Sequence, residues 1–223
     1  MVQLPSLIDH TVLRPDTTWA DVQRLCEEAK QYGFGAVFVP SCYAADAVAA
    51  VAGTTIRVGI PIGFPFGWQT TRSKVAEAIE GREMGALELD MVLNVSLLKS
   101  GRYDAVRADI EEVVRATLGA RHKVILETGL LTQEEKKIAC RLAVEAGADY
   151  VKTSTGFGPG GATVEDVRLM KEAVAGRAKV KASGGIRDLK TTLALLEAGA
   201  DRIGTSASVK IIEEWLEEQR RRR

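Results

Sequence analysis

A glycine followed at once by a short apolar segment recurs along this chain, and no other feature constrains the fold as strongly. The four copies are residues 32–39 (YGFGAVFV), 84–90 (MGALELD), 146–152 (AGADYVK) and 198–204 (AGADRIG). In each copy the glycine suits the left-handed position at a helix end, after which the chain enters a strand. Helices that alternate with strands in this way favour β/α units and a parallel sheet.

The whole chain follows the same alternation. Eight segments have the pattern of strands, centred on residues 7–9, 36–39, 56–60, 87–91, 124–127, 150–152, 179–182 and 202–205. Helical patterns fill the intervals, over residues 18–32, 44–52, 70–84, 103–117, 132–146, 163–175, 188–198 and 207–219. This α/β pattern predicts a (β/α)8 TIM barrel that forms a single domain over residues 1–223. A doubly wound open sheet is the rival, but the glycine-rich phosphate turn expected after its first strand is missing.

Two lysines stand near the ends of predicted strands, and a glycine-bearing turn follows each. They are Lys152 in residues 149–156 (DYVKTSTG) and Lys181 in residues 179–185 (KVKASGG). In a barrel these neighbouring strand ends lie at the face that carries active sites. A buried ammonium is costly unless its charge is lost or compensated, and two close lysines would each make the other harder to protonate. The pair predicts a neutral, nucleophilic amine near pH 7, as a Schiff-base enzyme needs. An ordinary exposed lysine is the alternative at either position.

One acidic residue lies among the apolar residues of the fourth predicted strand. Asp90 shares a strand face with Glu88, opposite the leucines of residues 88–94 (ELDMVLN). A buried carboxylate needs a partner. Asp90 is therefore either a structural ion pair with a lysine or a proton-transfer group beside it, and a single carboxylate can do both.

Glycines gather in the loops that follow the last three predicted strands. Gly156 follows the sixth, Gly184 and Gly185 follow the seventh, and Gly204 with Ser206 follows the eighth. Loops at these positions of a barrel often bind phosphate through backbone N–H groups and a helix N-terminus. Turns need glycine in any case, so each glycine alone is a weak signal. Together they predict a phosphate site to which Ser206 adds a hydroxyl.

Composition argues against several other classes of protein. The 30 basic and 30 acidic residues give a formal net charge of zero, whereas a nucleic-acid-binding protein normally has a basic excess. No apolar stretch is long enough to span a membrane, and the two histidines form no metal-binding motif. The three cysteines make no CxxC pair, which predicts free thiols in a reducing compartment and a cytoplasmic location.

Four segments resemble the deoxyribose-phosphate aldolase family. They are residues 58–67 (VGIPIGFPFG), 88–94, 151–157 (VKTSTGF) and 180–186 (VKASGGI), and the similarity extends in order from residue 7 to residue 208. The resemblance implies a class I aldolase that reversibly cleaves 2-deoxy-D-ribose 5-phosphate to D-glyceraldehyde 3-phosphate and acetaldehyde. It also implies that no cofactor or metal is needed and that the enzyme is a homodimer or a higher homo-oligomer.

The resemblance also implies roles for individual residues. Lys152 is the Schiff-base lysine, and Asp90 and Lys181 are its partners in a proton relay. Asp9 and Thr11 match polar positions near the substrate.

The sequence departs from the family at one position and leaves two other functions open. Phe38 stands where many members carry a cysteine, so a reactive thiol near the site is expected to be absent. One alternative function is another phosphate-binding barrel enzyme, such as a sugar-phosphate isomerase or a different Schiff-base aldolase. The other is a non-catalytic binding protein on the same scaffold.

Overall fold

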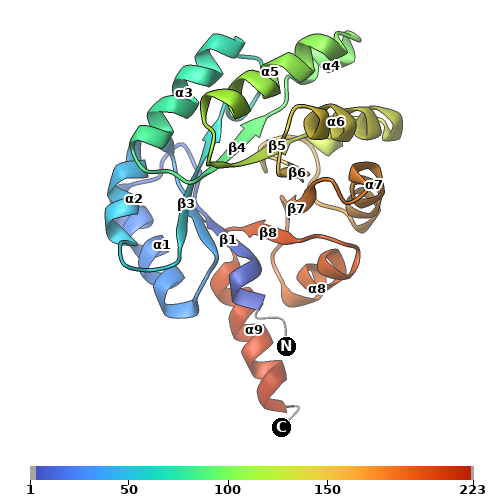
Figure 1. Ribbon diagram of the computed structural model, residues 1–223. Helices are drawn as coiled ribbons and strands as arrows, with labels where there is room; N and C mark the ends of the chain where they lie inside the picture. Colours follow the sequence, from blue (N-terminus) through green and yellow to red (C-terminus); the bar gives the residue numbers. More distant parts are fainter. Residues whose placement is uncertain (1–3, 222–223) are drawn as a thin grey trace.

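Eight parallel strands form a closed barrel with helices around it in this computed structural model, which describes residues 4–221 (Figure 1). The strands are β1 (Ile8–Thr11), β2 (Ala36–Phe38), β3 (Arg57–Ile62), β4 (Glu88–Val92), β5 (Arg121–Ile125), β6 (Tyr150–Lys152), β7 (Lys179–Ser183) and β8 (Arg202–Thr205). Their order in the sheet follows the chain, and β1 pairs with β8. The predicted TIM barrel is confirmed. Residues 1–3 and 222–223, which the single-domain prediction also covers, lie outside the described residues.

Helices cover the outside of the barrel (Figure 1). They are α1 (Trp19–Tyr32), α2 (Ala44–Ala50), α3 (Thr71–Glu83), α4 (Val95–Lys99), α5 (Tyr103–Ala116), α6 (Gln133–Glu145), α7 (Val164–Val174), α8 (Leu189–Glu197) and α9 (Ser208–Arg221). Short 3-10 turns occupy Leu4–Leu7, Ser41–Tyr43 and Thr128–Leu130. The sequence patterns did not predict α4. Within residues 4–221, none of these helices is long and apolar enough to cross a membrane.

Local sequence explains where several helices begin and end. Thr18 and Thr132 each close a capping box, with Asp21 and Glu135 respectively, so the first backbone N–H groups of α1 and α6 are satisfied. Gly33 ends α1 with a φ of 75°, in the left-handed region that glycine adopts without steric cost. This glycine is the first in the recurrent pattern that predicted the barrel.

Apolar side chains fill the space between the strands and the helices, whereas charged side chains and the ring of Phe38 occupy the barrel interior. Ile60 and Leu89 point outward, toward Gly81 of α3. Glu88 and Asp90 flank Leu89 in the chain, and their side chains point into the barrel because strand residues alternate. The alternation therefore places ionisable groups inside a closed sheet, where only other protein groups can compensate their charge.

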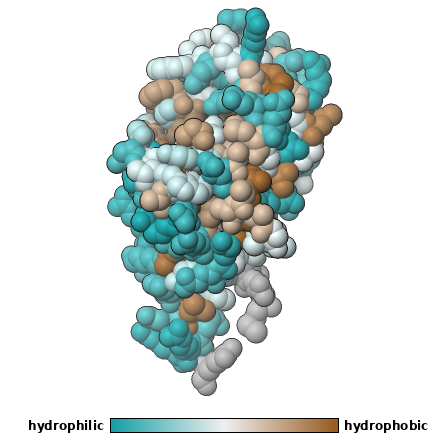
Figure 2. Space-filling view, turned by 90° about the vertical axis from the view of Figure 1, so that its left-hand side faces the viewer, coloured by the Kyte–Doolittle hydropathy of each residue, from teal (hydrophilic) through white to brown (hydrophobic). Residues whose placement is uncertain are grey.

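The outer surface is mixed in character. On the face to the left of Figure 1, where α1 and α2 lie, apolar residues are interspersed among hydrophilic ones (Figure 2). The cysteines are all free thiols, with Cys26 and Cys140 buried and Cys42 exposed. The absence of disulfides agrees with the pattern of cysteines in the sequence.

Candidate active site

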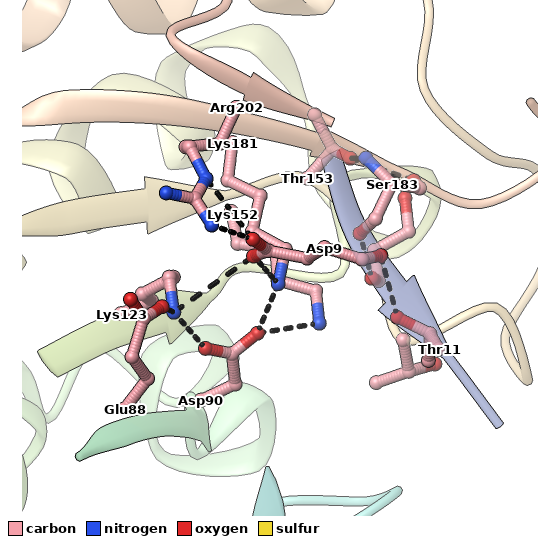
Figure 3. A network of polar contacts seen from close by, with 12 residues as sticks. Asp9, Thr11, Glu88, Asp90, Lys123, Lys152, Thr153, Lys181, Ser183 and Arg202 are labelled. Carbon is pink, nitrogen blue, oxygen red and sulfur yellow. Dashed lines mark hydrogen bonds and ion pairs between the residues drawn. The ribbon is translucent and has the colours of Figure 1, made fainter. Parts of the chain in front are cut away.

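The three residues predicted to carry the chemistry meet inside the barrel (Figure 3). Lys152 ends β6, Asp90 is in the middle of β4, and Lys181 is in the middle of β7. Asp90 Oδ2 accepts hydrogen bonds from Lys152 Nζ at 2.9 Å and from Lys181 Nζ at 2.7 Å. One carboxylate oxygen therefore bridges the two lysines.

A third lysine, which sequence reasoning missed, completes the cluster. Lys123 of β5 donates to Asp90 Oδ1 at 2.8 Å and makes a very short contact with Glu88 Oε2. The predicted strand is centred on residues 124–127 and does not include Lys123. Arg121, His122 and Lys123 are three consecutive polar residues, so the sequence has no strand pattern that could have included Lys123.

Asp9 belongs to the same buried network as the three lysines. Its side chain is fully buried, and its Oδ2 lies 2.6 Å from Lys181 Nζ. Arg202 of β8 contacts Asp9 Oδ1 through Nε at 3.0 Å and through a shorter Nη2 contact. Asp9 therefore contacts the lysine cluster through Lys181, and the position near the substrate that the family resemblance implies stays a prediction.

Burial and charge together set the protonation of these groups. Burial lowers the pKa of Lys152 to about 8, assisted by the charges of Lys181 and Lys123 and opposed by Asp90. Burial would raise the pKa of Asp90, but the charges of the three lysines outweigh burial and hold that pKa far below its usual range. Asp90 therefore stays ionised, while Lys152 can lose its proton near neutral pH.

The aromatic ring of Phe38 packs against the lysine side chains. Lys181 Nζ lies 3.8 Å from the ring centroid and Lys123 Nζ lies 4.5 Å from it, within cation–π range. Phe38 is buried, and a Cβ added at Gly59 of β3 would overlap its ring. The phenylalanine that departs from the family pattern thus forms one wall of the cluster, and Gly59 provides the space for it.

Hydrogen bonds between adjacent strand ends hold the segment that follows Lys152. Thr153 Oγ1 donates to the Ser183 carbonyl at 2.8 Å and accepts from the Ser183 N–H at 2.9 Å. Ser183 Oγ donates to the Ser154 carbonyl at 2.6 Å. These bonds join the ends of β6 and β7, so the position of Lys152 is fixed relative to Lys181.

A cavity of about 300 Å³ opens above Lys152 at the carboxyl ends of the strands. It contains five of the predicted binding residues: Thr11, Gly156, Gly184, Gly185 and Ser206. The three glycines have φ of 87°, 93° and 75°, all left-handed. The predicted loops therefore do meet around one cavity, beside the predicted nucleophile.

Two arginines that sequence reasoning did not single out, Arg14 and Arg187, also line this cavity. Their charge suits an anionic ligand. A larger hollow of about 720 Å³ lies between α8 and α9, but none of the clustered lysines lines it. We therefore assign the site to the smaller cavity, where the reactive groups are.

Within the part of the chain that the structure describes, no group of three or more His, Cys, Asp or Glu side chains is arranged to hold a metal ion. The expectation that catalysis needs no metal or cofactor stays a prediction. His10 follows Asp9 in β1, but its Nε2 contacts Glu28 of α1 at 2.7 Å. His122 Nε2 contacts Thr117 Oγ1 at 2.8 Å. Both histidines thus have structural partners outside the lysine cluster.

Comparison with known proteins decides the family. The family model described as DeoC/LacD family aldolase matches residues 4–212. The chain belongs to this family. A DeoC/LacD relative from Thermoanaerobacter sp. (strain X514), named deoxyribose-phosphate aldolase, is 54% identical over 217 residues that cover 96% of this chain and 97% of the relative. The chain is thus an aldolase, as the sequence predicted.

Solved structures support the DeoC/LacD assignment. An aldolase named QR15 superposes with a TM-score of 0.94 at 44% identity, covering 98% of each chain. The deoxyribose phosphate aldolase from Aeropyrum pernix, described as having a unique tetrameric structure, superposes with a TM-score of 0.90 at 35% identity. That match covers 96% of this chain and 91% of the other.

Proposed function

We propose that this aldolase cleaves 2-deoxy-D-ribose 5-phosphate to D-glyceraldehyde 3-phosphate and acetaldehyde through a Schiff base on Lys152. One observation carries the proposal. The amine of Lys152 lies beneath the cavity, within 2.9 Å of a carboxylate and with its pKa lowered to about 8. At pH 7 roughly a tenth of such an amine is neutral, against roughly one part in 3,000 for an ordinary lysine.

The first half of the reaction uses Lys152 as a nucleophile. Neutral Lys152 attacks the aldehyde carbon of the open-chain sugar, and the carbinolamine that forms loses water to give an iminium. The iminium withdraws electrons from C2. Removal of the proton from the C3 hydroxyl then breaks the C2–C3 bond, releases glyceraldehyde 3-phosphate and leaves an enamine. Protonation of that enamine and hydrolysis release acetaldehyde and restore Lys152.

Asp90 and Lys181 assist the proton transfers in these steps. Because Asp90 Oδ2 accepts a hydrogen bond from each lysine, it holds both amines beside the atoms that exchange protons in these steps. The lowered pKa of Asp90 makes it a poor proton store, so its role is to bridge the lysines and stabilise their positive charge. Lys181 repels the charged form of Lys152 and so favours the nucleophilic form.

The glycine-rich loops serve the phosphate of the substrate. Gly184, Gly185 and Ser206 line the cavity on the side where β7 and β8 end, and Ser206 precedes α9 by two residues. Backbone N–H groups in left-handed glycine turns suit phosphate oxygens. Arg14 and Arg187 add positive charge to the same cavity. Binding the distant phosphate there would orient C1 of the sugar toward Lys152.

We also propose that the enzyme is a homo-oligomer. The similar aldolase from Aeropyrum pernix is described as a tetramer, and most soluble oligomers are symmetric assemblies of identical chains. The mass of the native protein in solution, measured by light scattering, tests this. A monomer at working concentration would contradict it.

Trapping with acetaldehyde and cyanoborohydride, followed by peptide mass spectrometry, tests the Schiff base. We expect a reduced adduct on Lys152. The matched control is Lys179→Met, which removes an exposed lysine at the start of β7 and should leave trapping intact. An adduct on Lys181 alone would show that Lys181 is the nucleophile and Lys152 its partner. No adduct on a folded protein would reject the Schiff-base route.

Release of acetaldehyde from 2-deoxyribose 5-phosphate, followed with an alcohol dehydrogenase, tests the substrate. Release that disappears in Lys152→Met supports the proposal. An adduct without release would indicate a different Schiff-base aldolase. Phosphate binding with neither adduct nor release would indicate a non-catalytic binding protein.

A further inference from the structure

We infer that Glu127 is a positioning residue whose carboxylate fixes the wall of the substrate pocket that follows Lys152. The inference rests on the proposed function, because it concerns how that substrate is held. Glu127 comes two residues after β5, and only 4% of it is exposed. It belongs neither to the lysine cluster nor to the residues that line the cavity. Its side chain is directed instead at the loop after β6.

The carboxylate of Glu127 binds both polar groups of one loop residue. The Thr155 hydroxyl makes a very short hydrogen bond to Glu127 Oε2, and the Thr155 N–H lies 3.4 Å and 3.3 Å from Oε1 and Oε2. Thr155 Oγ1 in turn accepts from the Phe157 N–H at 3.0 Å. Thr155, Gly156 and Phe157 line the cavity beside Lys152. One carboxylate therefore orders three consecutive residues of the pocket wall.

The backbone at Glu127 is held in a conformation that favours glycine. Its φ is 55° and its ψ is 63°, and the only other non-glycine residue within residues 4–221 with positive φ is Ala175, at an exposed helix end. Pairing with β6 continues on both sides of it, through Leu126 N to Lys152 O at 2.9 Å and Thr128 N to Thr153 O at 3.0 Å. A turn alone would be served better by glycine. The strained conformation is explained by the direction it gives the carboxylate.

Two glycines allow the loops after β5 and β6 to approach each other closely. A Cβ added at Gly158 would lie 2.7 Å from Glu127 Cδ and 2.8 Å from Oε2. A Cβ added at Gly129 would overlap the carbonyl oxygen of Pro159. The loop after β6 therefore passes directly over the carboxylate of Glu127, and there is no room for a side chain at either contact.

Glu127 thus acts on the part of the site that holds the sugar and does not act on the imine chemistry. Lys152 Nζ is positioned by Asp90 of β4, without Glu127. Acetaldehyde alone needs only Lys152 and its partners. The phosphorylated sugar also needs the wall that Thr155 to Phe157 forms. Loss of the carboxylate should therefore raise KM for the sugar and leave iminium formation with acetaldehyde nearly unchanged.

The test compares Glu127→Gln and Glu127→Gly with a control, Glu134→Gln, which changes a glutamate of α6 whose side chain is 74% exposed. Glutamine keeps the shape and removes the charge, and glycine suits the left-handed backbone, so both variants should fold. We expect KM for 2-deoxyribose 5-phosphate to rise about tenfold in Glu127→Gly and less in Glu127→Gln. Trapping of acetaldehyde on Lys152 should stay within about twofold of wild type, as in the control.

Gly158→Ala offers an independent route to the same effect, because it pushes a methyl group against the carboxylate. Amide hydrogen exchange of residues 153–161, measured without any substrate, should be faster in all three variants and unchanged in Glu134→Gln. An unchanged KM for the sugar would overturn the inference. So would a loss of acetaldehyde trapping as large as the loss of sugar cleavage. If wild type does not cleave the sugar, the proposed function fails, and hydrogen exchange alone still decides whether Glu127 orders the loop.

Discussion

At the scale of the residue, the protonation of Lys152 depends on several groups with opposing effects. The sequence predicted that burial, together with repulsion by Lys181, would keep Lys152 neutral. In the structure burial has the largest effect and lowers the pKa, the charge of Asp90 comes next and raises it, and repulsion by Lys181 and then Lys123 lowers it further. Because burial dominates, no single neighbour should account for the whole shift. A positively charged neighbour should lower the pKa of Lys152, and a negatively charged neighbour should raise it.

The opposing effects of burial and charge on Lys152 predict how Schiff-base formation depends on pH. A lysine whose pKa is about 8 is protonated at lower pH, so the trapping rate should rise about tenfold per pH unit below 8 and level off above it. Lys181→Met should move the midpoint upward because a positive charge is lost, and Lys123→Met should move it upward by less. Asp90→Asn should move it downward.

Trapping rates measured between pH 5 and 10 check this series. Circular dichroism at each pH controls for unfolding, since loss of Asp90 leaves buried lysines without their carboxylate. A midpoint near that of a free lysine in wild type, or a downward shift in Lys181→Met, would contradict the electrostatic account.

At the scale of the element, four of the strands, β2, β4, β6 and β8, were predictable because each follows a glycine at a helix end. The boundaries of the strands were harder to predict than their existence. The predicted and observed ranges of β6 and β8 are identical. The segment at β5 begins with Arg121, His122 and Lys123, which have polar side chains. These residues do not look like a strand, because their burial depends on partners from other strands, such as Glu88. Helix α4 was missed because five residues are too few to show a helical repeat.

The same limit applies to the candidate site. That Lys152, Lys181 and Asp90 meet could be predicted, since each lies in a recognisable strand. Glu127 could not, because its role depends on a left-handed backbone and on a contact with a loop 28 residues away. Arg14 and Arg187 were also missed, because only the folded barrel places them on one cavity.

The packing of β2 against β3 leads to a prediction about stability. Gly59→Ala would place a methyl group against the ring of Phe38, and overpacking of this kind costs about 1–3 kcal/mol in the free energy of unfolding. The double variant Gly59→Ala with Phe38→Leu should recover part of that loss, because leucine leaves room for the methyl group. Urea unfolding of the two variants measures both effects. Equal stability of Gly59→Ala and wild type would show that the ring can move aside.

At the scale of the whole molecule, the first and last strands are joined by charge as well as by backbone pairing. Asp9 of β1 and Arg202 of β8 are in direct contact, and 11% of the Arg202 side chain is exposed. The backbones of the same two strands pair between Ile8 and Ile203. Closure of the barrel therefore coincides with neutralisation of a buried carboxylate.

Removal of this charge pair should weaken the whole domain. Arg202→Met leaves Asp9 with lysine partners only, and loss of one member of a buried ion pair costs about 3–5 kcal/mol. The matched control is Arg24→Met, which removes an arginine that is 64% exposed and paired with Asp21, and it should change stability little. Chemical denaturation followed by fluorescence compares the two. Equal midpoints would mean that closure does not depend on the Asp9–Arg202 contact.

Pairing of β1 with β8 also bears on how the chain folds as it is made. The ribosome synthesises β1 early. Asp9 and His10 of β1 pair with Gly204 and Thr205, which are synthesised almost 200 residues later. Until then the nascent chain has two unpaired sheet edges, at β1 and at β7, and such edges are prone to pair with other chains. Contacts so distant in sequence also slow folding. A pause in translation before β8 would therefore prolong the time in which the growing chain needs protection from aggregation.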